Sequence, residues 1–121
     1  MGQDAVEKWV QGYVRAWESN DPEDIARLFT EDAWYLTAPS RSPWSGRDQI
    51  VQGWLERKEK PGTWRFRFET IGSSGTLFFV RGWTEYPQEG EAYDNLWVLR
   101  LEGDRCSEFT EWWMKRPIET D

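Results

Sequence analysis

Apolar residues recur every three or four positions near the start of the chain, which is the spacing of one face of an α-helix. This pattern predicts an amphipathic helix over residues 4–19. The apolar positions that define its buried face are Val6, Trp9, Val10, Tyr13, Val14 and Trp17. Asp21 followed by Pro22 is typical of a helix N-cap with proline at the first helical position, and it predicts a second, short helix through Phe29.

A third helix is predicted after a strand and a loop. Residues 32–38 have the composition of the strand, and Ser45 and Asp48 have the spacing of a capping box. The helix that begins there is expected to stop near Pro61, because proline and the glycine after it end helices.

The second half of the chain alternates between apolar and polar residues, which is the two-residue period of β-strands. The predicted strands are residues 64–69, 76–86, 93–101 and 106–114, and the predicted turns are residues 72–75, 87–90 and 102–104. Helices followed by a run of antiparallel strands favour an α+β fold in which the helices pack on one face of a curved sheet. The length of 121 residues fits a single domain, residues 1–121.

Composition and charge exclude several classes of protein. Ten Trp, six Phe and four Tyr among 121 residues exclude a disordered chain, and a net charge of −7 argues against a nucleic-acid partner. The densest basic stretch, residues 57–60, is interrupted by Glu59 and is expected to be the cationic end of a helix. No stretch is long and apolar enough to span a membrane and no signal-peptide pattern is present, so we expect a cytoplasmic protein with no membrane partner.

The absence of histidine narrows the chemistry further. With no His, the chain can have no His-dependent triad, no imidazole acid–base catalysis and no His-ligated zinc. The single Cys106 cannot form an intrachain disulfide and is expected to be an inert packed thiol. Asp94 and Asn95 alone are too few oxygen ligands for a metal site, so we expect neither a metal nor another cofactor.

Three stretches of the chain carry the signatures of a known family. They are Tyr13–Trp17 with Asn20-Asp21 and Ile25–Ala33, the loop Ser42-Pro43-Trp44-Ser45-Gly46, and Gly103-Asp104-Arg105-Cys106 with Glu111-Trp112-Trp113. In these stretches the chain resembles nuclear transport factor 2-like proteins of the SnoaL-like branch. The resemblance implies a cone in which three N-terminal helices close a strongly bent antiparallel sheet, an α+β barrel, around one deep pocket.

The resemblance also allows the catalytic positions of the family to be checked. The ketosteroid isomerases of this superfamily use a tyrosine on the first helix, which Tyr13 matches. Their general-base aspartate falls near Thr37 and their second acid near Trp97, and neither residue replaces a carboxyl group. Related dehydratases and the SnoaL cyclases rely on His, and the Asp-Arg-Asp set of the epoxide hydrolases cannot be placed. We therefore expect a different chemistry, or binding alone.

Strand parity predicts which side chains face the pocket. Gly82 and Thr84 are small and would leave space for a ligand, so we expect their side of the strand to face the concave side. Matching the residues across the predicted turns then gives the inward-facing residues of the neighbouring strands. The predicted ligand-binding residues are Trp9, Trp17, Trp34 (with Tyr35 as its alternative), Thr37, Trp54, Phe66, Phe68, Val80, Thr84, Trp97, Phe109 and Trp113. The alternative interpretation is that these aromatic side chains fill the cone as a closed core.

The inward-facing polar residues are the candidates for catalysis. Glu111 shares its face of the strand with Phe109 and Trp113, and such apolar surroundings raise the pKa of a carboxyl group. The predicted catalytic set is Glu111 with Tyr13 and Asn95 as its hydrogen-bonding companions. The alternative is that Glu111 pairs with an arginine and has a structural role.

These observations predict a protein that binds a small apolar or aromatic molecule and, if it is an enzyme, one that uses carboxylate acid–base chemistry. The alternatives are a non-catalytic binder that encloses an organic cation, and an interaction domain whose cone is filled. A homodimer through the convex face of the sheet is also predicted, because its outward-facing apolar side chains form a large surface to leave in water. They are Phe79, Trp83, Leu96, Val98 and Trp112.

Overall fold

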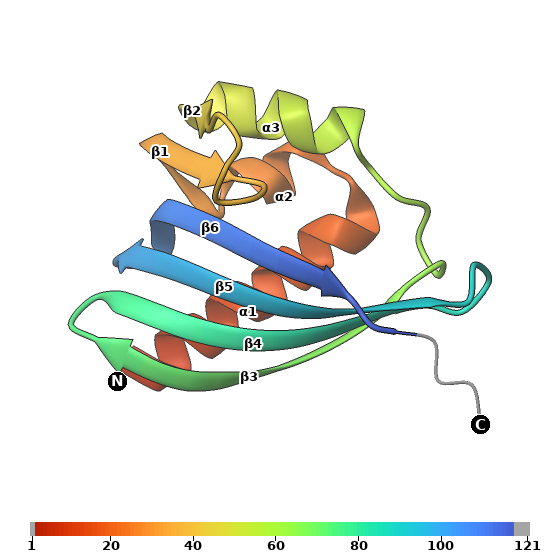
Figure 1. Cartoon of the computed structure of the whole chain (residues 1–121). Coiled ribbons are helices and arrows are strands. Elements are labelled where there is room, and N and C mark those ends of the chain that lie inside the picture. The colour runs from red at the N-terminus through yellow and green to blue at the C-terminus, as the bar shows by residue number, and fades with distance from the viewer. Residues whose placement is uncertain (1, 118–121) are drawn as a thin grey trace.

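The computed structural model describes residues 2–117. Its helices are α1 (Gly2–Ser19), α2 (Pro22–Ala26) and α3 (Arg47–Glu56), and its strands are β1 (Phe29–Leu36), β2 (Trp44–Ser45), β3 (Arg65–Ser74), β4 (Leu77–Tyr86), β5 (Glu91–Glu102) and β6 (Arg105–Lys115). The helices gather on one side of a curved sheet (Figure 1). The predicted α+β class, with N-terminal helices on a bent sheet, is confirmed.

The six strands follow the order β2-β1-β6-β5-β4-β3, and the sheet is open because β2 and β3 form its two edges. Strands β3 to β6 form an antiparallel meander, whereas β1 pairs in parallel with β6 and antiparallel with β2. The parallel pairing places Phe29 of β1 opposite Cys106 of β6. Strand β1 therefore joins the meander of β3 to β6 only through β6. Bulges in β3, β6 and β1 bend the sheet around the helices.

Helix α1 packs along the concave face, as its apolar spacing predicts. Val6, Trp9, Val10 and Tyr13 are buried against the sheet, and Trp17 stacks on Trp64 with ring centroids 3.7 Å apart. This row of side chains covers the core residues of β4, β5 and β6. The side chains of α1 therefore fill the space between this helix and the sheet.

Two predictions of helix starts can be compared with the structure. Asp21 is the N-cap of α2, where its carboxylate accepts a hydrogen bond from the backbone N–H of Glu23 at 2.9 Å, as predicted. The predicted Ser45 capping box is wrong, since Ser45 lies in β2 and Gly46, with φ 89°, is the N-cap of α3 without a side-chain cap. A glycine is needed there because the left-handed φ excludes most other residues.

The turn between β3 and β4 was also misplaced. It lies at Gly75 and Thr76 rather than at residues 72–75, because a bulge at Ile71 shifts the register and lets β3 continue to Ser74. The turn at Gly103 and Asp104 is where the sequence predicted it.

Candidate functional site

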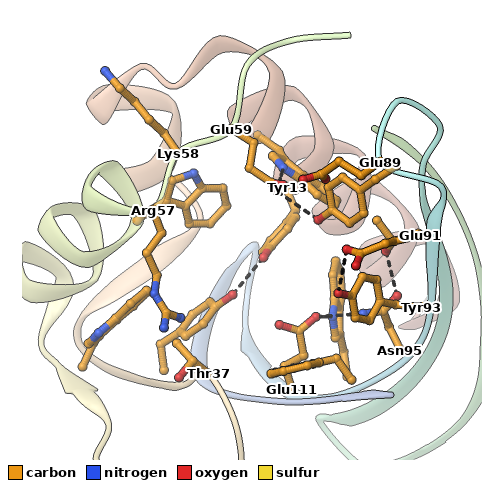
Figure 2. Close-up of a pocket in the computed structure, with 18 residues that line it drawn as sticks. Tyr13, Thr37, Arg57, Lys58, Glu59, Glu89, Glu91, Tyr93, Asn95 and Glu111 are labelled. Atoms are coloured by element: carbon orange, nitrogen blue, oxygen red, sulfur yellow. Dashed lines mark hydrogen bonds between the residues drawn. The ribbon is translucent and has the colours of Figure 1, made fainter. Parts of the chain in front are cut away.

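A cavity of about 390 Å³ opens between the concave face of the sheet, α1 and the end of α3 (Figure 2). Nine of its 18 lining residues are aromatic. The lining residues are Tyr13, Trp17, Tyr35, Thr37, Trp44, Trp54, Arg57, Lys58, Glu59, Thr84, Tyr86, Glu89, Glu91, Tyr93, Asn95, Trp97, Glu111 and Trp113. The space inside the cone is therefore filled with core side chains at one end and hollow at the other.

Glu111 projects into this cavity from β6. The register of β5 and β6 places it directly opposite Trp97, and its Oε2 accepts hydrogen bonds from Trp97 Nε1 at 2.9 Å and from Asn95 Nδ2 at 3.1 Å. Thr84 Oγ1 donates to Asn95 Oδ1 at 2.7 Å, so the amide of Asn95 is oriented with its NH₂ group towards Glu111. Both donors reach Oε2, and Oε1 accepts no hydrogen bond from any residue within 2–117.

Burial raises the pKa of Glu111 from its ordinary value of 4.5 to about 7. The hydrogen bonds from Trp97 and Asn95 and the positive charge of Arg57 favour the carboxylate, whereas the negative charge of Glu59 raises the pKa further. No Lys or Arg of the described residues lies within ion-pair distance of Glu111. Glu111 can therefore both accept and release a proton near neutral pH.

A pair of buried tyrosines forms the wall next to Glu111. The hydroxyl oxygens of Tyr13 and Tyr35 are 2.8 Å apart, so one hydroxyl donates to the other and the second retains a hydrogen that it can donate elsewhere. Burial, together with the nearby Glu111 carboxyl group, raises the pKa of both tyrosines well above their ordinary range. Both hydroxyls thus remain protonated donors across the neutral pH range.

Glu59 lies on the loop after α3 and forms the opposite part of the wall. Its Oε1 accepts hydrogen bonds from Trp17 Nε1 and from the hydroxyl of Tyr86, each at 3.1 Å. Its backbone carbonyl accepts a hydrogen bond from Asn20 Nδ2 at 3.0 Å, which ties the loop to the end of α1. This second carboxyl group is thus held in a fixed position at the cavity.

A family model described as the SnoaL-like domain matches residues 10–109. The chain belongs to the SnoaL-like domain family. This family is part of the nuclear transport factor 2-like superfamily, which the sequence signatures had indicated. No curated protein matches the chain at a significant level.

Solved structures similar to this SnoaL-like domain share its fold at low sequence identity. An NTF-2-like protein of unknown function from Burkholderia xenovorans LB400 is 16% identical with a TM-score of 0.75, over 100% of this chain and 91% of that one. A ketosteroid isomerase-like protein from Erwinia carotovora atroseptica SCRI1043 is 20% identical with a TM-score of 0.66, over 90% and 93%. An LEH-like epoxide hydrolase from M. tuberculosis is 14% identical with a TM-score of 0.64, over 94% and 86%.

The structure brings nine of the sequence-predicted site residues of this SnoaL-like domain together around the cavity. They are Tyr13, Trp17, Thr37, Trp54, Thr84, Asn95, Trp97, Glu111 and Trp113. The expected contact between Tyr13 and Glu111 is not a hydrogen bond, since the hydroxyl of Tyr13 pairs with Tyr35 instead. The catalytic and binding roles of these residues stay predictions.

Six predicted ligand-binding residues do not line the cavity. Trp9, Val80 and Phe109 are buried in the filled end of the cone, and Phe66 and Phe68 pack against that core from β3. Trp34 was the wrong choice within β1, because Ala33 and Tyr35 occupy the buried parity and leave Trp34 on the opposite face.

Sequence reasoning missed seven of the lining residues. They are Trp44, Arg57, Lys58, Glu59, Glu89, Glu91 and Tyr93. The sequence predicts the basic stretch at residues 57–60 to be the cationic end of a helix, and in the structure its first three residues line the cavity. Glu59 was the signal available in the sequence, because an acidic residue does not favour the negative C-terminal end of a helix dipole and therefore indicates another role.

No helix within residues 2–117 is long and apolar enough to cross a membrane. The same part of the chain contains no group of three or more His, Cys, Asp or Glu side chains arranged to hold a metal ion.

Proposed function

We propose that this SnoaL-like domain binds a small, largely apolar or aromatic molecule in the cavity and that Glu111 transfers a proton to or from it. The observation that carries the proposal is a carboxyl group with one free oxygen, Oε1, in an aromatic cavity, and with a pKa of about 7. Sites with mostly apolar walls and a few convergent polar groups are typical of small-molecule pockets.

The arrangement supports a division of roles between two polar groups. Glu111 Oε1 removes a proton from a carbon atom of the ligand when it is ionised, and it returns the proton when it is protonated. The free hydroxyl hydrogen of the Tyr13–Tyr35 pair donates to a ligand oxygen on which negative charge develops. Asn95 and Trp97 hold Oε2 still, so that Oε1 keeps its direction into the cavity.

Proton exchange at an enolisable aromatic ketone tests the proposal. The protein is incubated with 2-tetralone in D₂O, and loss of the α-proton signal is followed by NMR across the neutral pH range. We expect the protein to accelerate exchange with an apparent pKa of about 7, and Glu111→Gln to abolish the acceleration.

Glu108→Gln is the matched control, because Glu108 lies on the same strand but on the convex face, paired with Arg100. This control variant should exchange as fast as the wild type. Saturable quenching of tryptophan fluorescence by 2-tetralone without any accelerated exchange would support binding alone and refute the catalytic part of the proposal.

We also propose that two copies associate through the convex face of the sheet. The apolar side chains on that face are Phe79, Trp83, Leu96, Val98 and Trp112, and the last of these is 40% exposed. Ion pairs between Arg81 and Glu69 and between Arg100 and Glu108 flank them and provide the polar rim that such interfaces have.

A further inference from the structure

The two sides of the cavity differ in charge. Figure 2 shows Arg57 and Thr37 on one side, whereas Glu59, Glu89 and Glu91 lie at the other. The guanidinium of Arg57 lies 5.9 Å from the ring centroid of Trp44, against the wall that Thr37 also lines. Lys58 also lines the cavity, but the amine end of its side chain points away from it (Figure 2). The side around Glu59 is therefore acidic.

On the acidic side, the carboxyl group of Glu59 is held in place by hydrogen bonds and has no positively charged partner among the described residues. Glu91 is paired with Lys115, whereas no Lys or Arg within residues 2–117 lies within ion-pair distance of Glu59. The hydrogen bonds from Trp17 and Tyr86 both reach Oε1, and Oε2 accepts none from the described residues. One oxygen of an oriented carboxyl group is thus available to a ligand.

Aromatic rings surround the space next to this oxygen. Tyr86 and Tyr93 are edge-to-face with centroids 5.9 Å apart, and Tyr93 and Trp113 are edge-to-face at 5.8 Å. Trp113 is 49% exposed although it lines the cavity, so its ring is not taken up by the core. Aromatic faces beside a carboxyl group attract organic cations, because the ring quadrupole and the carboxylate both favour positive charge.

We propose that the ligand of the cavity carries a protonated amine, which Glu59 binds among Tyr86, Tyr93 and Trp113 while the apolar part of the ligand extends towards Glu111. This inference rests on the proposed function and adds the class of ligand: an apolar or aromatic amine. The net charge of −7 attracts such a cation over longer distances.

A matched pair of probes tests the amine. Binding of 2-naphthylmethylamine and of its neutral analogue 2-naphthylmethanol is measured by isothermal titration calorimetry at neutral pH and low salt. We expect the wild type to bind the amine about tenfold more tightly than the alcohol, which is the effect of one charge-assisted contact. Glu59→Gln should remove this preference and leave the affinity for the alcohol unchanged, because glutamine still accepts the hydrogen bonds from Trp17 and Tyr86.

Glu85→Gln separates the local contact from the overall charge. Glu85 is exposed on the strand that carries Tyr86 but points to the opposite face, so its replacement removes one negative charge away from the cavity. This variant should keep the preference for the amine.

The outcomes distinguish the ligand class from the function on which it rests. Equal binding of both probes by the wild type, or a preference that survives Glu59→Gln, overturns the amine site and leaves the cavity as a site for neutral molecules. Binding of neither probe overturns the amine site and also the proposed binding function. The comparison of probes on the wild type requires no variant, so a failure of Glu59→Gln to fold does not affect it.

Discussion

Replacing Glu111 with glutamine should stabilise the folded protein at neutral and alkaline pH. The folded pKa of Glu111 is raised from 4.5 to about 7, so between these values the folded protein binds more protons than the unfolded chain. Stability therefore falls as the pH rises through this window, and the loss is complete above the folded pKa. A shift of this size corresponds to about 3 kcal/mol of destabilisation once Glu111 is ionised.

Glutamine has the same shape, still accepts hydrogen bonds from Asn95 and Trp97, and does not titrate. We expect Glu111→Gln to match the wild type closely near pH 4.5, where both side chains are neutral. The free energy of unfolding of the variant should then exceed that of the wild type by an increasing amount, reaching about 3 kcal/mol above pH 7.5. The melting temperatures should differ by about 10 °C at that pH.

Urea denaturation followed by tryptophan fluorescence, at pH values from about 4.5 to about 8, measures this difference. The two proteins differ at one side chain, so the contributions of groups distant from Glu111 cancel in the difference. Glu108→Gln, on the face of β6 opposite to Glu111, should show a small difference from the wild type that does not depend on pH in this way. A difference for Glu111→Gln that is constant across the range would refute the raised pKa and the acid–base role built on it.

Three further predictions concern packing, association and the thiol. Gly82→Ala places a methyl group 2.6 Å from the ring of Phe66 and should lower the free energy of unfolding by about 1 to 3 kcal/mol, whereas Gly72→Ala, whose nearest contact is at 3.5 Å, should have a much smaller effect; urea denaturation of both variants decides this. Sedimentation at tens of micromolar should give twice the chain mass of 14.4 kDa for the wild type and a monomer for Trp112→Glu, and a wild-type monomer would contradict the proposed dimer. Cys106 is fully buried and burial raises its pKa, so a thiol reagent should label it only when the protein unfolds; rapid labelling of the native protein would be inconsistent with this packing.

The position of Glu111 could be predicted because it depends on local alternation. Phe109, Glu111 and Trp113 share one face of β6, as the alternation predicts. The turn at Gly103 and Asp104 brings β5 and β6 together, but the pairing of Glu111 with Trp97 also depends on the bulge at Ser107, since the turn alone would place Thr110 opposite Trp97. The raised pKa was expected for the same reason, namely the apolar neighbours on that face.

Interactions between distant parts of the chain could not be predicted in this way. The Tyr13–Tyr35 pair requires β1 to lie in parallel beside β6, and nothing in the local pattern of residues 32–38 specifies that neighbour. The choice between Trp34 and Tyr35 depended on the same unknown, because both are large aromatic residues suited to a buried strand. Glu59 lies in a loop, where there is no period from which a direction could be read.

The parallel pairing of β1 with β6 has a consequence for how the chain folds during its synthesis. Phe29 pairs with Cys106, which the ribosome adds roughly 75 residues later. At ordinary translation rates, about 5 to 20 residues per second, β1 therefore waits for roughly 4 to 15 s before its neighbour exists. During that interval the apolar face of α1 has no complete sheet to cover, and the nascent chain exposes several tryptophans to its surroundings. The six-stranded sheet is therefore complete only after β6 has been synthesised.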